Sequence, residues 1–203
     1  GRTNDPYGGD FLEQVAMTPK KTRDSRLRKI QDALKLIVPQ LKELKFEQDT
    51  RNGVPHLLGL YEHWRPNAGW QSEEQFSDGT LRLIGLLWSL QEGKGPLLLE
   101  EPELSLHSEV VRYLPQAILK VMRKSHRQII VSTHSRELVS DKGIMPEELL
   151  ILVPSPEGTQ IEAGSKDPVM LEIAKNGGSA ADVAFAKTSP LKSVEQIDLL
   201  ELL

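Results

Sequence analysis

The sequence has 203 residues, of which 38% are hydrophobic and 27% are charged, and its formal net charge is −4. This length supports one sizeable core or two small ones, and the composition is ordinary for a soluble globular domain. The absence of cysteine excludes disulfides, thiol catalysis and thiolate metal sites. The acidic balance gives no global attraction to nucleic acid, although local patches could still bind it.

The sequence shows no targeting or membrane-spanning segment. No apolar stretch approaches the roughly 20 residues that cross a bilayer, and the opening GRTNDPYGGD lacks the basic and apolar regions of a secretory signal. We therefore expect a cytoplasmic protein without a membrane partner. The chain starts without methionine in a polar stretch, so we also expect it to be a piece of a longer protein.

The first element is a predicted amphipathic helix. Asp24 or Ser25 can cap it, and Pro39 should kink or divide it. The segment KKTRDSRLRK (20–29) holds six basic residues and one acidic residue. We favour a solvated helix start for this segment over a DNA- or partner-binding patch. The apolar residues that recur at helical spacing are Leu27, Ile30, Leu34, Ile37, Leu41 and Leu44.

A hairpin and a second helix follow. In KFEQDTRNGVPHLLGLYEH, Asn52-Gly53 predicts a tight turn with positive φ angles. After a polar loop, Ser77 or Asp78 starts a helix with one apolar face. That face carries Leu81, Ile84, Leu87 and Leu90.

The second half of the chain alternates short apolar runs with helical patterns. PLLLE, RQIIVSTHS and ELLILV (148–153) predict three strands buried on both faces of a parallel sheet. A helix over about 108–122 should join the first two. TQIEAG could add an edge strand, and 168–176 a last helix. This order implies right-handed βαβ crossovers and a three-layer α/β sandwich.

Polar clusters fall where two of these strands end. Glu100 and Glu101 close PLLLE, and Ser132, Thr133 and His134 close the next strand. In open parallel sheets, ligands bind beyond the carboxyl ends of the strands. Acidic groups there suit a hard cation such as Mg²⁺ and a base that orients water. An exposed EE pair in a loop is the simpler alternative. A transition-metal site that includes His107 and His134 is disfavoured, because no tight ligand spacing supports it.

Three segments in this order resemble the motifs of a known family. QFSDGTLRL, PLLLEEPELSLH and IIVSTHS resemble the signature motif, the Walker B motif with D-loop, and the H-loop of ABC-type ATPases. The likeness is closest to the soluble branch of OLD, RecF and SMC-like proteins, including the predicted AAA-family ATPases of phage-defence and toxin–antitoxin loci. It covers about residues 76–135, and it implies a three-layer P-loop NTPase fold with a mainly parallel sheet.

The resemblance also implies roles for individual residues. Glu100 takes the Walker B position and holds Mg²⁺ through water, whereas Glu101 matches the catalytic glutamate that polarises the attacking water. His134 matches the histidine that contacts the γ-phosphate. Glu103 to His107 form the D-loop. Ser77, Asp78 and Gly79 replace the usual SGG and face the γ-phosphate of ATP with a hydroxyl and a helix N-terminus.

Parts of the family pattern are changed or missing. Glu100 stands where aspartate is usual, and Asp78 replaces a glycine near a polyanion. No G-x-x-x-x-G-K-[ST] segment occurs, and Gly93-Lys94-Gly95 precedes a strand rather than a helix. The chain therefore resembles the C-terminal half of an ATPase head. We divide it into a segment that re-enters the head (1–62), the ATPase core (63–153) and a C-terminal extension (154–203).

The function implied is ATP binding and hydrolysis, with Mg²⁺, in a head that dimerises on ATP. The expected partners are an N-terminal P-loop lobe, a second copy of the protein, and DNA or an effector protein in DNA repair or anti-phage defence. The alternative is a non-catalytic half-domain that regulates a partner. A transporter subunit fits less well, because transporter signatures read close to LSGGQ. The tail after residue 153 shows no nuclease pattern.

Overall fold

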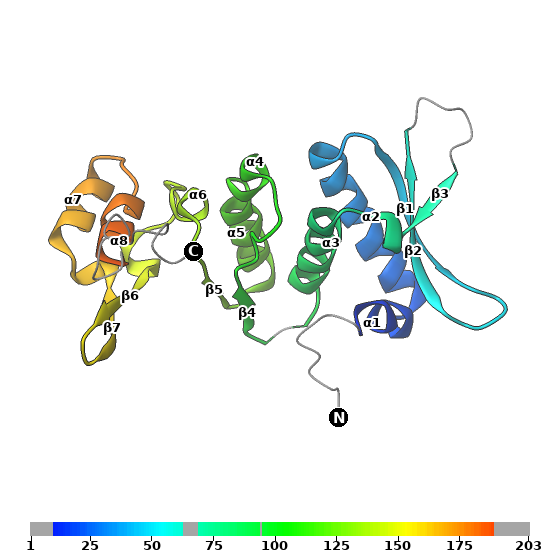
Figure 1. The fold of residues 1–203 in the computed structure, drawn as a ribbon, viewed down its shortest axis with the longest axis horizontal. Coiled ribbons are helices and arrows are strands. Elements are labelled where there is room, and N and C mark those ends of the chain that lie inside the picture. The colour runs from blue at the N-terminus through cyan, green and yellow to red at the C-terminus, as the bar shows by residue number, and fades with distance from the viewer. Residues whose placement is uncertain (1–9, 63–68, 94, 189–203) are drawn as a thin grey trace, which may run out of the picture.

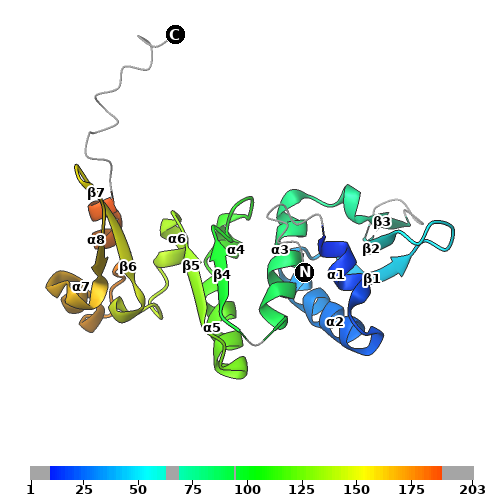
Figure 2. The ribbon, with the colours of Figure 1, turned by 90° about the horizontal axis from the view of Figure 1, so that it is seen from below.

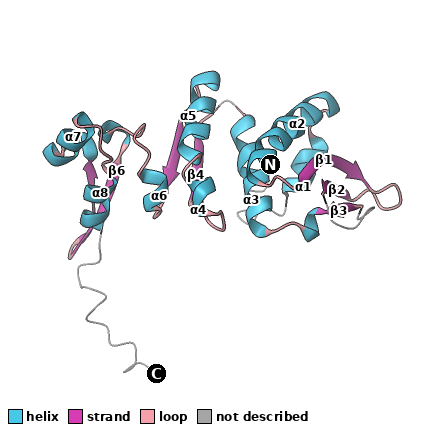
Figure 3. Cartoon of the chain, turned by 90° about the horizontal axis from the view of Figure 1, so that it is seen from above, coloured by secondary structure: helices cyan, strands magenta, loops and turns pink. Residues whose placement is uncertain are grey.

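The computed structural model describes residues 10–62, 69–93 and 95–188. Its elements follow one another along the long axis of the molecule, from α1 and the β1–β3 sheet at one end to α7 and α8 at the other (Figure 1). The strands form three separate sheets, with the orders β1-β2-β3, β4-β5 and β6-β7, and Figure 3 shows them in magenta. The helices that precede or connect the strands of the first two sheets are α1 (Phe11–Met17), α2 (Lys20–Ile37), α3 (Asp78–Gln91), α4 (Ser108–Val111) and α5 (Leu114–Ser125).

The predicted first helix is shorter than expected and begins earlier. α2 starts at Lys20 behind Pro19 and ends at Ile37, so the helix stops before Pro39 instead of being kinked by it. Leu41 and Leu44 were predicted on this helix but lie on β1 (Leu41–Gln48). Both are buried although they are three residues apart, because the strand register shifts between Leu41 and Glu43. That irregularity reproduces a helical spacing within a strand.

The hairpin is confirmed, with a longer turn than predicted. β1 pairs antiparallel with β2 (Pro55–Tyr61). Gly53 has a φ of 74°, but Asn52 is not among the described residues with positive φ. Its side-chain oxygen instead accepts a hydrogen bond of 3.0 Å from the Val54 amide. The segment expected as a polar loop contributes a third strand, β3 (Trp70–Ser72), and the 3-10 turn η1 (Glu73–Gln75).

The helix expected to start at Ser77 or Asp78 is confirmed. Ser77 is the N-cap of α3, and its Oγ accepts a hydrogen bond of 3.2 Å from the Thr80 amide. The buried surface is broader than one stripe, because α3 lies between α2 on one side and α5 on the other. Its buried residues are Thr80, Leu83, Ile84, Leu86, Trp88 and Leu90.

The two strands that carry the candidate site pair in parallel, as predicted. β4 (Leu97–Glu100) and β5 (Ile129–Ser132) match residue for residue, from Leu97 opposite Ile129 to Glu100 opposite Ser132. The prediction that both faces of these strands are buried is wrong. Leu97, Leu99, Ile129 and Val131 pack on the core, whereas Leu98 is 71% exposed and Ile130 is 50% exposed. Helix α5 and the core cover one side of this sheet (Figure 2).

The helix predicted over 108–122 is two helices. α4 ends at Val111, and α5 begins at Leu114 with Pro115 in its first turn. Proline fits the first turn of a helix but not its interior, so Pro115 marks a new start. The short helix α6 (Arg136–Val139) follows β5, and its N-cap Ser135 accepts from the Leu138 amide at 3.2 Å.

The prediction of a third parallel strand at 148–153 is wrong. β6 (Leu150–Ser155) pairs antiparallel with β7 (Gly158–Ala163) in a sheet of its own, so TQIEAG does form a strand but the β5–β6 crossover does not extend the parallel sheet. A short turn at Gly158, with φ of 123°, lets the chain reverse directly. The last helices are α7 (Pro168–Lys175), which was expected, and α8 (Ala181–Thr188), which was not.

Two clusters of buried side chains hold these elements together. The larger runs from Val15 to Leu138 and includes residues of α1, α2, α3, β1, β2, α4, α5 and α6. The smaller one packs Ile151 and Met170 against Ala180 and Ala184. An ion-paired Lys187 fastens it, because its Nζ lies 2.6 Å from Asp167 Oδ2 and 2.7 Å from Glu162 Oε2. Within the described part of the chain, no helix has the length and apolarity to cross a membrane.

Candidate functional site

The polar residues at the ends of β4 and β5 lie together. The Glu101 amide donates a hydrogen bond of 2.8 Å to the Ser132 carbonyl, which completes the pairing of Glu100 with Ser132 at the end of the parallel strands. Glu101 then takes a φ of 42°, and the chain turns sharply away from the sheet. A glutamate in this left-handed region is uncommon, so tertiary structure imposes the turn. The loop that follows (101–107) is held by a hydrogen bond of 3.1 Å from the Leu104 amide to the Glu101 carbonyl.

Glu101 and His134 are brought side by side by this geometry. His134 Nε2 lies 3.6 Å from Glu101 Oε1, an ion pair whenever the imidazole is protonated. The Glu101 side chain is 32% exposed and that of His134 is 92% exposed. Both groups are therefore open to a ligand beyond the strand ends, and the pair can act on a water molecule or a phosphate there.

Glu100 points to the opposite side of the chain from Leu99 and shares the open face with Leu98 and Ile130. Successive residues of a strand alternate between faces, and Glu100 and Leu98 are both exposed. No group of three or more His, Asp or Glu side chains that could hold a metal occurs among the residues described. Mg²⁺ needs no such cage, since it is usually held by one or two carboxylates, water and substrate phosphates. One exposed carboxylate at a strand end fits that ion.

Ser77, Asp78 and Gly79 form the N-terminal turn of α3. The Ser77 hydroxyl is engaged with Thr80, whose Oγ1 lies 2.9 Å away and whose amide donates to it. Asp78 is exposed in the first turn, where a carboxylate suits the positive end of the helix dipole. Among the described residues, no hydrogen bond or ion pair joins this turn to Glu100, Glu101 or His134. The site thus has two separate parts on one chain.

Gly79 packs against loop 101–107. A Cβ built on Gly79 would lie 2.6 Å from the Ser105 carbonyl oxygen, closer than real Cβ contacts allow. Ser105 itself has a φ of 64°. The glycine therefore permits α3 to approach the loop that continues from Glu101, and this contact links the two parts of the site.

A partly buried side-chain contact fixes the same loop to the end of β5. Thr133 Oγ1 donates a short hydrogen bond to Glu103 Oε1 and accepts one of 2.9 Å from the Ser135 amide. The other carboxylate oxygen, Glu103 Oε2, is buried without a hydrogen-bond partner. No role was predicted for Thr133 from the sequence. Nothing in the local spacing marks its partner Glu103, which lies thirty residues earlier in the sequence.

Two further contacts involve the segments that carry the site residues, and neither was predicted. Arg127 is 9% exposed and donates to the carbonyls of Ser89 (2.8 Å), Glu92 and Gly95 (2.5 Å), which ties the end of α3 to the start of β4.

The second contact lies ahead of Ser77, where Glu73 Oε1 is 2.9 Å from His56 Nδ1. This hydrogen bond, with the charge of Glu73, raises the pKa of His56 above 6.5.

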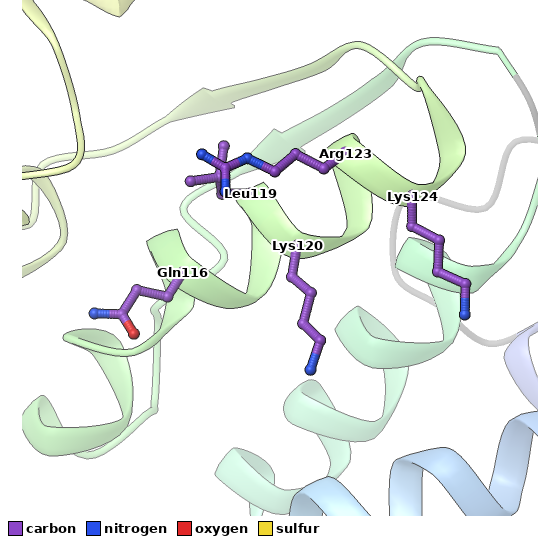
Figure 4. Close-up of a pocket in the computed structure, with 5 residues that line it drawn as sticks. All are labelled: Gln116, Leu119, Lys120, Arg123 and Lys124. Carbon is purple, nitrogen blue, oxygen red and sulfur yellow. The ribbon is translucent and has the colours of Figure 1, made fainter.

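Two other predicted or apparent features lie outside the site. His107 caps α4, with its Nδ1 accepting a hydrogen bond of 3.3 Å from the Glu109 amide, which is a structural role. A hollow of about 460 Å³ lies along α5. It is lined by residues of that one helix (Figure 4), namely Gln116, Leu119, Lys120, Arg123 and Lys124. None of the predicted site residues borders it.

The chain is similar to solved structures of SMC proteins. One is described as "Structural biochemistry of ATP-driven dimerization and DNA stimulated activation of SMC ATPases", with a TM-score of 0.54 and 12% identity over 82% of this chain and 91% of that chain. Another is the Smc head domain with an extended coiled coil bound to the C-terminal domain of ScpA, from Pyrococcus furiosus, with a TM-score of 0.43 and 13% identity over 58% of this chain and 30% of that chain. The first likeness shows a shared fold.

The chain belongs to the family described as "AAA domain, putative AbiEii toxin, Type IV TA system". The family model matches residues 4–140, which is more than half of the chain. This match confirms the predicted membership in the ABC/AAA-type ATPases. None of the curated proteins matches the sequence.

Proposed function

We propose that this chain supplies the signature, metal-binding and water-activating groups of an ATP-hydrolysing head whose P-loop comes from a separate lobe. The observation that carries the proposal is the face shared by Glu100, Leu98 and Ile130. A carboxylate suited to Mg²⁺ and two apolar side chains that need cover lie on one side of the β4–β5 sheet. A lobe that covers this face would bring its bound nucleotide to Glu100.

The apolar face supplies affinity for such a lobe. Leu98 and Ile130 are neighbours in register and largely exposed. Burial of one such side chain contributes roughly 1.5–3 kcal/mol. The lobe is part of the same gene product or a second chain. The divisions at residues 62 and 153 belong to the same proposal.

Each site residue has a proposed task. Glu100 would hold the Mg²⁺ that accompanies ATP, through water, and the ion would neutralise charge on the phosphates. Glu101 would orient and polarise the attacking water, and His134, 3.6 Å away, would contact the γ-phosphate. Removal of a positioned general base costs roughly 10²- to 10⁴-fold in rate.

The N-terminal turn of α3 would act across a dimer interface. Ser77, Asp78 and Gly79 would face the γ-phosphate of ATP held by the opposite subunit, where backbone amides and the helix dipole favour an anion. Among the described residues, no hydrogen bond or ion pair joins this turn to Glu101 or His134, which supports this division of labour. A two-fold dimer would then contain two shared sites.

The comparisons support a cellular setting for the ATPase. The family description names a putative AbiEii toxin of a type IV toxin–antitoxin system, which supports a role in anti-phage defence. The similar SMC ATPases are described as dimerising with ATP and being stimulated by DNA, which supports DNA, or an effector protein in its place, as a partner in defence or DNA repair.

The test uses the chain together with its P-loop lobe, as wild type, Glu101→Gln, Ser77→Arg and the control Glu109→Gln. Glu109 is an exposed acid just after loop 101–107. We expect Glu101→Gln to bind ATP and to dimerise with ATP and magnesium in light scattering, while phosphate release falls roughly 10²- to 10⁴-fold. Ser77→Arg should block dimerisation by its bulk without weakening ATP binding. Glu109→Gln should behave as wild type.

Two results would contradict the proposal. Phosphate release by Glu101→Gln within about threefold of wild type would remove Glu101 from the role of general base. Equal closure by Ser77→Arg and wild type would show that the α3 turn does not act in trans. The chain without its lobe should show no magnesium-dependent ATP binding by calorimetry, because it lacks a phosphate-binding loop.

A further inference from the structure

We propose that Glu103 and Thr133 form a positioning pair that sets His134 in its working position and couples it to the dimer interface. This inference rests on the proposed function. The Thr133 hydroxyl donates to Glu103 Oε1, thirty residues away in sequence, and accepts from the Ser135 amide. His134 lies between the two residues of that turn.

The position of His134 depends on the backbone of its turn. Its side chain is 92% exposed and contacts Glu101 at 3.6 Å. Little packing therefore restrains the ring itself. The Thr133 hydroxyl accepts from the Ser135 amide and so fixes the peptide group that follows His134, while its hydrogen bond to Glu103 holds the hydroxyl itself in place. Glu103 is in this way the anchor for a residue that it does not touch.

The same anchor is connected to the N-terminal turn of α3. Glu103 accepts a hydrogen bond of 3.0 Å from the Leu106 amide through its carbonyl, and Ser105, between them, lies against Gly79. A displacement of the α3 turn by a partner subunit would therefore press on loop 101–107 and reach Thr133 through Glu103. This path offers a way for dimer closure to align His134 before hydrolysis.

With no role beyond folding, Glu103 would be an unfavourable residue for the stability of the folded state. Its Oε2 is buried and has no hydrogen-bond partner in the described structure. Buried acceptors without partners destabilise a fold, and replacement of both partners by apolar groups of similar shape is often neutral or stabilising. A purely structural contact would be better made by a leucine and a valine. The acid and hydroxyl are thus explained by positioning.

The test measures turnover and stability in the chain with its P-loop lobe. The variants are Thr133→Val, Thr133→Ser, Glu103→Leu and the double variant Thr133→Val/Glu103→Leu, with Glu109→Leu as the matched control. We expect Thr133→Val and Glu103→Leu each to lower kcat roughly 10- to 100-fold, as for a misplaced group near the reacting atoms, with unchanged KM for ATP and retained ATP-driven dimerisation. Thr133→Ser should restore turnover. The double variant should be no slower than either single variant and at least as thermally stable as wild type.

Several outcomes would overturn the inference. One is unchanged kcat in both single variants. Another is a double variant whose losses multiply, since the two residues would then act independently. A third is a fall in kcat that only follows a fall in Tm, which would indicate a structural contact. An inactive wild type, or an active Glu101→Gln, would instead count against the proposed ATPase function. In that case the thermal stabilities of the single and double variants would still test whether Thr133 and Glu103 are coupled.

Discussion

Gly79 and Ser105 lie so close that a Cβ atom on the glycine would come within 2.6 Å of the serine carbonyl oxygen. This contact is between two backbones, so no side-chain rotation can relieve it. The start of α3 and the turn of loop 101–107 are therefore matched to each other in shape.

We expect Gly79→Ala to lower the free energy of unfolding by about 1–3 kcal/mol, as for other overpacked sites. Gly85 is the matched control on the same helix, because a Cβ there would meet nothing within 4 Å. Gly85→Ala should raise stability by roughly 0.5–1 kcal/mol, since alanine is the better helix former. Urea denaturation of the two variants measures the difference. Equal effects in both would show that the contact with Ser105 does not restrict position 79.

Arg127 should be the most sensitive basic residue near the site. Arg127→Met would leave the carbonyls of Ser89, Glu92 and Gly95 without their buried donor, and we expect a loss of about 2–4 kcal/mol. Arg123→Met, on the exposed surface of α5, should change stability by less than about 0.5 kcal/mol. Thermal unfolding followed by circular dichroism distinguishes them. A small effect of Arg127→Met would mean that water replaces the guanidinium at these carbonyls.

The His56–Glu73 pair predicts a pH dependence. Because Glu73 raises the pKa of His56 above its ordinary 6.5, the folded state binds the proton more tightly than the unfolded state. The stabilisation is fully present below pH 6.5 and is lost as the pH rises through the raised pKa. Urea midpoints of wild type and His56→Gln should therefore differ most at acid pH and converge at alkaline pH. A constant difference across this range would rule out the linkage.

The open face of the β4–β5 sheet predicts a docking defect without a folding defect. Leu98→Asp should abolish co-purification with the P-loop lobe but leave the Tm of the chain alone nearly unchanged, because Leu98 is already 71% exposed. Leu36→Asp is the control, since Leu36 on α2 is 85% exposed and lies far along the chain from the strand pair. Retained co-purification of Leu98→Asp would place the lobe elsewhere.

Local patterns predicted the elements that depend on neighbouring residues. Each of these elements is specified within a few positions of the sequence. They are the cap at Ser77, the hairpin around Gly53 and the strands ending at Glu100 and Ser132. Parallel pairing also predicted that the polar clusters after these two strands would lie at one edge of the sheet, where Glu101 and His134 are 3.6 Å apart. Periodicity failed at Leu41 and Leu44, where a shift in strand register imitates a helical repeat.

Contacts between distant segments could not be predicted in the same way. An apolar run such as PLLLE does not state which of its faces is covered in this chain, so the exposure of Leu98 was missed. ELLILV reads as a parallel strand until its antiparallel pairing with β7 is seen. The bond between Thr133 and Glu103 and the carbonyl contacts of Arg127 join residues about thirty or more positions apart. Nothing in local spacing marks such partners.

The uncovered side of the β4–β5 sheet also bears on how the protein must be produced. A leucine and an isoleucine lie next to each other in water, on short strands whose outer edges pair with no other strand in the described part of the chain, and they favour association between copies of the chain. If the lobe that covers this side is a second chain, synthesis of this polypeptide in excess over it should thus lead to aggregation or degradation. The cell would have to match the supply of the two parts, and co-expression at equal dose is the natural route to soluble material.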